Sequence, residues 1–258
     1  MKLSIITPSL NQCDYLRHTT RTILDQPHPP ELEWIVIDGG STDGTINLLR
    51  SINDPRLKWV SEPDRGQSDA VNKGLAQATG DIVGWLNSDD LYTTGALAAV
   101  AEAMTNNPQA QWLVGRCGII NDVDQPIRAT VTRYKNRSLR RYSYRRLLRE
   151  NFISQPAVFW RRTFGQQVGP LDLSLYYTMD YDFWLRMGRC CQPLVLPDQL
   201  ASFRLHPTSK SGLTDRRQFD EQFRVACRYT HDSVTRGLHR FNVEKIVWSY
   251  RAMNLLRF

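Results

Sequence analysis

Two neighbouring aspartates, Asp89 and Asp90, follow an apolar run in the segment IVGWLNSDD. Like charges placed side by side repel each other unless a cation joins them. Hard divalent cations such as Mg²⁺ and Mn²⁺ typically bind one or two carboxylates together with substrate phosphates. The pair therefore predicts a divalent metal site. The alternative is that the two acids simply begin a helix, as an N-cap and an acidic first turn.

Three more side chains are candidates for chemistry. Asp38 ends the run WIVID and precedes two glycines, which fits either a ligand contact or a plain turn. Asp180 opens the segment MDYDFWLRM and fits either a general base or a helix N-cap. His206 lies in FRLHPTSKS and fits either a ligand role or an ordinary surface or core histidine. The local sequence leaves each pair of alternatives open.

Alternating strand and helix signals in the first half of the chain would position these acids. Short β-rich runs predict strands over 3–7, 33–38, 57–60 and 81–86. Apolar spacing predicts helices over 14–24, 41–52, 68–78 and 94–104. Buried strands separated by helices predict a single Rossmann-like, mostly parallel α/β sheet flanked by helices. Ligands bind at the carboxyl ends of the strands in such sheets, which is where Asp38, Asp89 and Asp90 lie.

The second half of the chain is less regular. Strands are expected over 157–160 and 193–197, and helices over 179–188, 218–231 and 243–256. No linker rich in Gly, Pro or Ser interrupts the chain, so we expect one continuous domain over 1–211, followed by a C-terminal helical extension over 212–258.

The composition is that of a globular protein, with 41% hydrophobic and 23% charged residues. No segment approaches the roughly 20 apolar residues that a membrane-spanning helix needs, and the N-terminus lacks the pattern of a secretory signal. Five scattered cysteines without a CxxC pair argue against a disulfide framework or a zinc site. We therefore expect a cytoplasmic protein.

The net charge is +7, and the excess is concentrated in RYKNRSLRRYSYRRLLR, residues 133–149, with eight cationic residues and no acidic one. A solvated face is one interpretation of this run. The other is a peripheral contact with an anionic membrane, on the inner face, or with a lipid-linked substrate. Arginine and tyrosine also alternate in nucleic-acid sites, but nothing else in the sequence supports that role, and we expect no nucleic-acid partner.

The glycine-containing segments argue against two enzyme classes, the dinucleotide-binding hydride-transfer enzymes and the P-loop kinases. The segment GGSTDG lacks the G-x-G-x-x-G spacing of dinucleotide-binding proteins, and no P-loop occurs.

Six segments in this order resemble the family 2 glycosyltransferases, which have the GT-A fold. They are SIITPSLN, WIVIDGGSTDGT, EPDRGQSDAVNKGLAQATGDIVGWLNSDD, ISQPAVFWRR, MDYDFWLRM and FRLHPTSKS. The resemblance is close over about 3–104 and looser to about 211. It implies an inverting transfer of a sugar from a nucleotide-diphosphate-sugar to an acceptor hydroxyl, with Mn²⁺ or Mg²⁺ as cofactor.

The resemblance also implies roles for particular residues. Asp180 matches the catalytic base, and Asp90 and His206 match metal ligands, with Asp90 the direct one. The residues implied to contact the nucleotide-sugar are Pro8, Ser9, Asp38, Arg65, Asp69 and Asp89. The chain departs from the family at Gly39, where many members have a second acid, and at Met179, where a Glu usually precedes the base.

The function predicted from the sequence is thus that of a metal-dependent glycosyltransferase. Its expected partners are a nucleotide-diphosphate-sugar donor and a saccharide or lipid-linked saccharide acceptor, in the synthesis of a cell-surface polysaccharide or glycolipid. Gly39 and Met179 keep an alternative open, namely a catalytically weak or inactive regulatory protein that binds nucleotide-sugars.

Overall fold

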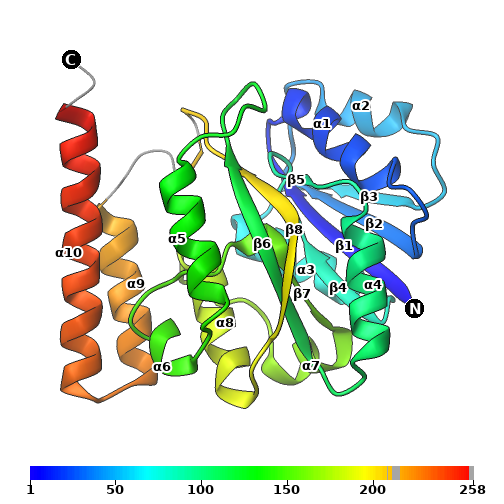
Figure 1. Cartoon of the computed structure of the whole chain (residues 1–258). Helices are drawn as coiled ribbons and strands as arrows, with labels where there is room; N and C mark the ends of the chain where they lie inside the picture. Colours follow the sequence, from blue (N-terminus) through cyan, green and yellow to red (C-terminus); the bar gives the residue numbers. More distant parts are fainter. Residues whose placement is uncertain (208, 211–215, 256–258) are drawn as a thin grey trace.

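An eight-stranded sheet forms the centre of the molecule, with helices on both faces (Figure 1). The computed structural model describes residues 1–207, 209–210 and 216–255. The strand order is β3-β2-β1-β4-β7-β6-β8-β5. The strands are β1 Lys2–Ser9, β2 Glu31–Asp38, β3 Leu57–Ser61, β4 Ile82–Trp85, β5 Leu91–Tyr92, β6 Trp112–Ile120, β7 Val158–Arg161 and β8 Leu194–Arg204. The α/β fold with flanking helices is confirmed.

The sheet is parallel in its first half and mixed in its second. Strands β1 to β4 pair in parallel, as the alternation of strands and helices predicts. Strand β7 then runs antiparallel between β4 and β6, and the short β5 pairs antiparallel with the parallel β6–β8 unit. Four of the seven adjacent pairs are therefore parallel, so the sheet is less uniformly parallel than expected.

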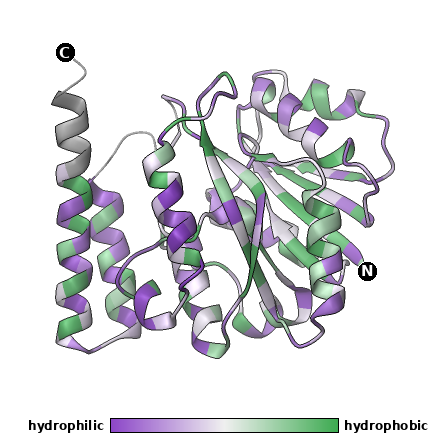
Figure 2. Ribbon diagram, in the orientation of Figure 1, coloured by the Kyte–Doolittle hydropathy of each residue, from purple (hydrophilic) through white to green (hydrophobic). Residues whose placement is uncertain are grey.

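Alternation along the central strands divides the core into two layers. Ile6 of β1 and Ile35 of β2 face one hydrophobic cluster, whereas Ile5 and Trp34 face the other. Successive strand residues point to opposite faces, so a strand buried on both sides must be apolar throughout. Figure 2 shows these strands as hydrophobic ribbons inside a more hydrophilic shell of helices.

Each core layer is covered by its own set of helices. The layer around Ile5 is covered by α1 Cys13–Leu24, α2 Thr45–Ser51 and α4 Ala96–Asn106. The other is covered by α3 Gln67–Gln77, α5 Ala129–Leu139, α6 Tyr144–Leu147, α7 Arg162–Val168, α8 Met179–Cys190 and α9 Arg216–Tyr229. The last helix, α10 Ser233–Leu255, packs on α9 at the outer edge of the molecule (Figure 1).

Several helix boundaries differ from those expected. Helix α2 begins at Thr45 rather than at 41, because Asp43 binds the backbone N–H groups of Cys13 and Thr45 and holds the preceding loop out of the helix. Helix α10 begins ten residues before the expected 243, since Asp232 accepts hydrogen bonds from the N–H and hydroxyl of Thr235. The expected boundary at 211/212 and the expected helix end at 256 lie outside the described residues.

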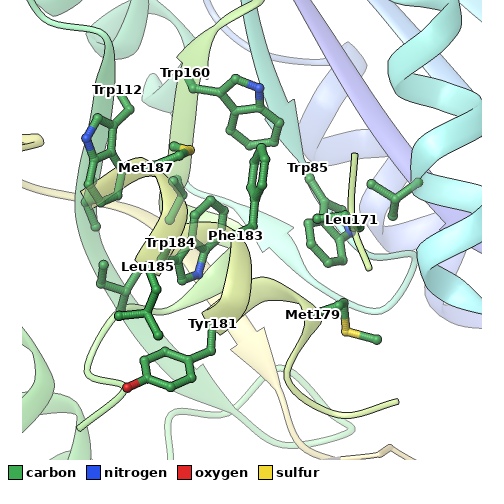
Figure 3. Close-up of a cluster of buried hydrophobic side chains, with 14 of the residues drawn as sticks. Trp85, Trp112, Trp160, Leu171, Met179, Tyr181, Phe183, Trp184, Leu185 and Met187 are labelled. Atoms are coloured by element: carbon green, nitrogen blue, oxygen red, sulfur yellow. The ribbon is translucent and has the colours of Figure 1, made fainter. Parts of the chain in front are cut away.

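Helix α8 is buried on nearly all sides, which fixes the position of its first turn. Phe183 and Trp184 pack edge-on against Trp160, and Trp184 stacks on Trp112 (Figure 3). The hydroxyl of Tyr181 donates to the carbonyl of Leu147 at 2.7 Å. A helix that is apolar around its circumference is held by packing rather than by an exposed polar face.

Glu33 ties the amino-terminal ends of the central strands together. Its carboxylate is 2% exposed. It accepts hydrogen bonds from the hydroxyl of Ser4, the N–H and hydroxyl of Thr79, and the ammonium of Lys58. Burial opposes ionisation, but the bond from Lys58 and the other donors outweigh it and bring the pKa of Glu33 well below its usual range.

We predict that Glu33→Gln lowers the free energy of unfolding by about 2–4 kcal/mol, because it leaves buried donors without a charged partner. Because the pKa of Glu33 is lowered in the folded state, its stabilisation is present above the unfolded value near 4.5 and is lost as pH falls below it. Urea unfolding at pH 7 and pH 3 measures both effects. Glu31→Gln, at an exposed position of the same strand, is the control. Equal stability of the two variants at pH 7 would contradict the role of Glu33.

Candidate functional site

The carboxyl ends of the parallel strands bring the predicted donor-binding residues together. Ser9 of β1 pairs in register with Asp38 of β2, and Asp38 pairs with Ser61 of β3. The segment after β4 lies on the other side of β1, where the N–H of Leu86 donates to the carbonyl of Ile6. Pro8 and Ser9 therefore lie between the loop after Asp38 and the turn that carries Asp89 and Asp90.

Asp38 is fully buried, and its carboxylate shapes the loop that follows β2. It accepts hydrogen bonds from the N–H groups of Gly40 and Ser41, at 3.0 and 2.9 Å, and from the hydroxyls of Ser41 and Ser61. In this structure the Asp38 carboxylate therefore stabilises the turn that follows β2, which is the second of the two interpretations of this residue. By contrast, the hydroxyl of the buried Ser9 has no hydrogen-bond partner among the described residues, which leaves a donor available at the strand ends.

Gly39 leaves space that a neighbouring carboxylate fills. A Cβ atom at position 39 would lie 2.7 Å from Oδ2 of Asp64 and 3.5 Å from Cδ1 of Leu10. The other oxygen of Asp64 accepts the N–H of Gly66 at 2.8 Å. A carboxylate therefore does stand beside Asp38, and it comes from the loop after β3 rather than from position 39.

Arg65 and Asp69 form a pair at the start of α3. The guanidinium of Arg65 donates to Asp69 at 2.9 Å, and the backbone N–H of Arg65 donates to the same carboxylate at 3.1 Å. The bond from Arg65 holds the pKa of Asp69 below its usual range. The side chain of Asp69 is nearly buried, whereas that of Arg65 is 75% exposed. Arg65 is thus anchored on Asp69 through both its backbone and its guanidinium, while most of its side chain remains exposed.

The segment from Asn87 to Asp90 is a tightly held turn and not a helix start. Helix α4 begins only at Ala96, after the short strand β5, so the N-cap interpretation of the two acids is wrong. The hydroxyl of Thr19 in α1 donates to the carbonyls of Ser88 and Asp90 at 2.8 and 2.9 Å. The guanidinium of Arg204 donates to the carbonyl of Asp89 at 2.7 Å.

Asp90 points into the protein. Its side chain is fully buried and accepts hydrogen bonds from the backbone N–H of Arg204, at 2.8 Å, and from the amide of Asn87, at 3.3 Å. Burial raises the pKa of Asp90 well above its usual range, and the negative charge of Asp89 adds to the effect. The adjacent carboxylates thus differ in environment, because Asp90 is withdrawn from solvent and hydrogen-bonded within the protein.

Asp89 points the other way and meets His206. The carboxylate of Asp89 lies 3.0 Å from Nε2 of His206, which follows the end of β8. The imidazole is buried and packs on the ring of Tyr15, with the ring centroids 4.6 Å apart. The two residues are 117 positions apart in sequence, and the pairing of β8 with β6 and β5 brings them together.

A cavity of about 460 Å³ lies beside this turn and contains the candidate base. Asp180 lines it together with Gln155, whose amide oxygen accepts a hydrogen bond from Asn87 at 3.1 Å. Its other walls are formed by residues of α5, β8, α9 and α10, among them Lys135, Phe203, Gln222 and Ile246. Since Asn87 also donates to Asp90, two side chains connect Asp90 to the cavity of Asp180.

Asp180 has the environment of a general base. Helix α8 has Thr178 as its N-cap residue and no side-chain cap, so Asp180 is not the N-cap. Its Oδ1 accepts the N–H of Tyr181 at 2.6 Å. Burial raises the pKa of Asp180 to about 6, against smaller lowering effects of the Tyr181 N–H and the Lys135 ammonium. A carboxylate of this kind is ionised at neutral pH, yet it is basic enough to take a proton.

Glu221 of α9 holds the segment that leads into Asp180. Its Oε1 accepts the N–H groups of Tyr177 and Thr178 at 2.7 and 2.8 Å and the hydroxyl of Thr178 at 2.9 Å. Its Oε2 accepts the N–H of Tyr176 at 3.2 Å. Position 179 has no carboxylate, but Glu221 lies close enough to raise the pKa of Asp180.

Sequence reasoning missed the residues that hold the predicted ones in place: Asn87, Lys135, Gln155, Arg204 and Glu221. Asn87 and Gln155 lie inside motif segments, so their position was the available signal. Arg204 likewise lies inside the segment FRLHPTSKS. No local pattern marks Glu221, because it acts on a segment far away along the chain.

Comparison with known proteins relates this site to a family. The sequence model of the family described as glycosyl transferase family 2 matches residues 4–165. An uncharacterized glycosyltransferase of Mycobacterium tuberculosis is 30% identical over 206 residues, which are 78% of this chain and 74% of the relative. A PGL/p-HBAD biosynthesis glycosyltransferase of Mycobacterium bovis is 31% identical over 187 residues, 71% of this chain and 68% of the relative.

A shorter stretch matches a putative teichuronic acid biosynthesis glycosyltransferase of Bacillus subtilis, TuaG, with 40% identity over 105 residues, 40% of this chain and 41% of the relative. Among solved structures, mannosyltransferase PcManGT from Pyrobaculum calidifontis, in complex with GDP-Man and Mn²⁺, superposes with a TM-score of 0.71 at 19% identity, covering 95% of this chain and 69% of that one. TarS 1-349 of S. aureus, in complex with UDP-GlcNAc, superposes with a TM-score of 0.67 at 18% identity, and the match covers 88% of this chain and 66% of that one.

The structural likeness shows the GT-A fold, and the sequence match carries the family assignment. Most of the match lies in the part of the chain that forms the strand ends, the turn with Asp89 and Asp90, and strand β7. The chain belongs to glycosyl transferase family 2.

Proposed function

We propose that this glycosyltransferase is an inverting enzyme that moves a sugar from a nucleotide-diphosphate-sugar to an acceptor hydroxyl. The observation that carries the proposal is the position of Asp180. Its carboxylate lines a cavity of about 460 Å³. Gln155 lines the same cavity and is hydrogen-bonded to Asn87, which donates to Asp90 in the turn with Asp89. A candidate base in a cavity that borders an acidic, donor-side turn suits a single displacement.

The donor is proposed to bind at the carboxyl ends of β1, β2 and β3. Pro8, the free hydroxyl of Ser9, the loop around Asp38 and the guanidinium of Arg65, anchored on Asp69, border this region. Asp64 supplies a second carboxylate over Gly39, so the departure at position 39 does not remove the acidic character of the base-binding end. PcManGT and TarS bind GDP-Man and UDP-GlcNAc, which supports a nucleotide-sugar as the class of donor.

Asp89 and His206 are proposed to hold the divalent cation, Mn²⁺ or Mg²⁺. Their carboxylate and imidazole come within 3.0 Å of each other, whereas both oxygens of Asp90 are buried and hydrogen-bonded. We therefore assign Asp89 as the direct ligand, in place of the expected Asp90, and Asp90 as the residue that orients the turn. No three His, Cys, Asp or Glu side chains form a metal site in the described part of the chain, and such ions commonly complete their shell with substrate phosphates.

The chemistry follows from the charges that develop during transfer. Asp180 accepts the proton of the acceptor hydroxyl as that oxygen attacks the anomeric carbon from the face opposite the nucleotide, so the configuration inverts. A bound divalent cation would stabilise the negative charge of the departing diphosphate. Lys135 lies near Asp180 and keeps it ionised at neutral pH. Residues of helices α9 and α10 form part of the cavity wall beside Asp180.

The acceptor is proposed to be a saccharide or lipid-linked saccharide in cell-surface polysaccharide or glycolipid synthesis, on the inner side of the membrane. The relatives named for teichuronic acid and PGL/p-HBAD biosynthesis support this class. Nothing in the described residues forms a helix that is both long and apolar enough to cross a bilayer. A peripheral contact with anionic lipid, and a cytoplasmic location, remain part of the proposal.

We predict that Asp180→Asn lowers turnover by about 10²- to 10⁴-fold, because an amide cannot accept the proton. Donor affinity should stay close to that of the wild type, since the donor lies at the strand ends. Transfer assays with a panel of nucleotide-sugars, together with calorimetry of donor binding, measure both quantities. Asp198→Asn, at an exposed position of β8, is the matched control. Wild-type turnover by Asp180→Asn would exclude Asp180 as the base, and absence of any donor turnover by the wild type would favour a regulatory binding protein.

We predict that Lys135→Met moves the acidic limb of the pH–rate profile to higher pH. The limb reports ionisation of Asp180 near pH 6, and the Lys135 cation lowers that pKa, so its removal raises it. The rate at pH 6 should fall more than the rate at pH 8. The control is Arg133→Met, because Arg133 lies on the same helix but does not line the cavity. An unchanged limb would show that Lys135 does not act on the base.

We predict that Asp89→Asn weakens metal-dependent donor binding by about 10-fold or more, whereas Asp90→Asn keeps the metal dependence and lowers stability instead. Donor calorimetry with Mn²⁺ or with a chelator, combined with thermal unfolding, separates the two variants. The opposite pattern, with metal dependence lost only in Asp90→Asn, would restore Asp90 as the direct ligand.

A further inference from the structure

A second hollow, of about 480 Å³, lies between β6 and α5 and shares no lining residue with the cavity of Asp180. Its lining consists of five arginines and one asparagine: Arg116, Arg133, Asn136, Arg137, Arg140 and Arg141. We call it the arginine groove. The spacing of three and four residues places the groove members of α5 on one face of that helix, and Figure 2 shows hydrophilic bands along α5.

The arginines of the groove lack acidic partners. Across the residues that the structure describes, no carboxylate lies within 4.0 Å of any of these five guanidinium groups. Several arginines elsewhere do have acidic partners: Arg56 meets Asp54 at 2.7 Å, Arg186 meets Asp182 at 2.9 Å and Arg228 meets Asp172 at 2.8 Å. Five like charges around one hollow repel each other, and an anion would relieve that repulsion.

The helix dipole explains only part of the cluster. Cations near the C-terminal end of a helix are stabilised by the partial negative charge there, which accounts for Arg137, Arg140 and Arg141. It does not account for Arg133 in the second turn of α5, nor for Arg116, which comes from β6. The stability of α5 therefore does not explain why Arg133 and Arg116 also line the groove.

The groove is also preformed. The amide of Asn136 accepts the N–H of Cys117 at 3.3 Å and donates to the carbonyl of the same residue at 3.4 Å. These bonds fix α5 against β6 at the floor of the hollow. The two elements that carry the groove arginines are thus held together before any ligand arrives.

We propose that the arginine groove binds a phosphate-bearing ligand with two or more negative charges. Guanidinium groups present planar forks that match phosphate oxygens two at a time, and the volume suits a small anionic group. An anionic lipid headgroup and a free polyphosphate share this chemistry. The proposal does not depend on the transferase reaction, because the groove and the cavity of Asp180 lie on different faces of α5.

The test compares two triple variants of equal charge in buffer containing a chelator. Arg133→Gln/Arg137→Gln/Arg140→Gln removes three arginines of the groove. Arg17→Gln/Arg21→Gln/Arg50→Gln removes three exposed arginines of α1 and α2. Calorimetry with inorganic tripolyphosphate forms one arm, and flotation with phosphatidylglycerol vesicles, against phosphatidylcholine vesicles, forms the other. Both variants keep the donor site, so phosphate binding there cancels in the comparison.

We expect the groove variant to bind about 100-fold more weakly than the wild type, because three charge-assisted contacts are lost, and the control variant to bind nearly as the wild type does. Binding in the tripolyphosphate arm identifies a free anion, and binding in the vesicle arm alone identifies a lipid headgroup. If the groove variant unfolds, Arg116→Gln/Arg141→Gln replaces it. The proposal is overturned by no binding in either arm, by equal losses in the two variants, or by an oligonucleotide that binds the same arginines more tightly.

Discussion

The burial of Asp90 is the constraint on which the donor side of the site depends. A carboxylate withdrawn from water must be hydrogen-bonded, and the partners of Asp90 are the backbone of Arg204 and the amide of Asn87. Those bonds join the turn after β4 to the end of β8. With Thr19 holding the same turn from α1, its backbone has few alternatives, and Asp89 is left facing His206. Asp90 thus has a structural role, and Asp89 is the acid that we propose as the metal ligand.

The position of Asp180, the proposed base, likewise depends on other residues that hold it in place. Asp180 stands on a helix fixed by large aromatic side chains (Figure 3), and the backbone before it is held by Glu221 of α9. The C-terminal helices therefore do more than extend the domain. Glu221 of α9 positions Asp180, the proposed base, and residues of α9 and α10 line its cavity, so we include α9 in the proposed catalytic unit.

Helix α5 separates the two hollows of the second half. One face carries Lys135, which faces the cavity of Asp180, and the other carries arginines of the groove. The cationic run at 133–149 is therefore not uniform, because burial lowers the pKa of Lys135 while the groove arginines remain solvated. Cationic residues of one segment therefore lie in two different environments, because they project from different faces of α5.

The sequence by itself determined the elements of the first half and the identity of the acids at their ends. Apolar runs bounded by turn residues leave a strand few alternatives, and the carboxyl ends of parallel strands meet at one edge. It also made Asp180 a candidate base, because that carboxylate stands at the start of a predicted helix, in a segment that resembles the family's base motif.

Tertiary structure alone decided which acid is buried, how Asp64 fills the space above Gly39, and that Glu221 of α9 holds the backbone before position 179. It also placed His206 against Asp89, 117 residues away in sequence. These features depend on contacts between distant segments. Local propensity carries no information about such contacts, because the sequence around each of these residues is equally compatible with a surface loop.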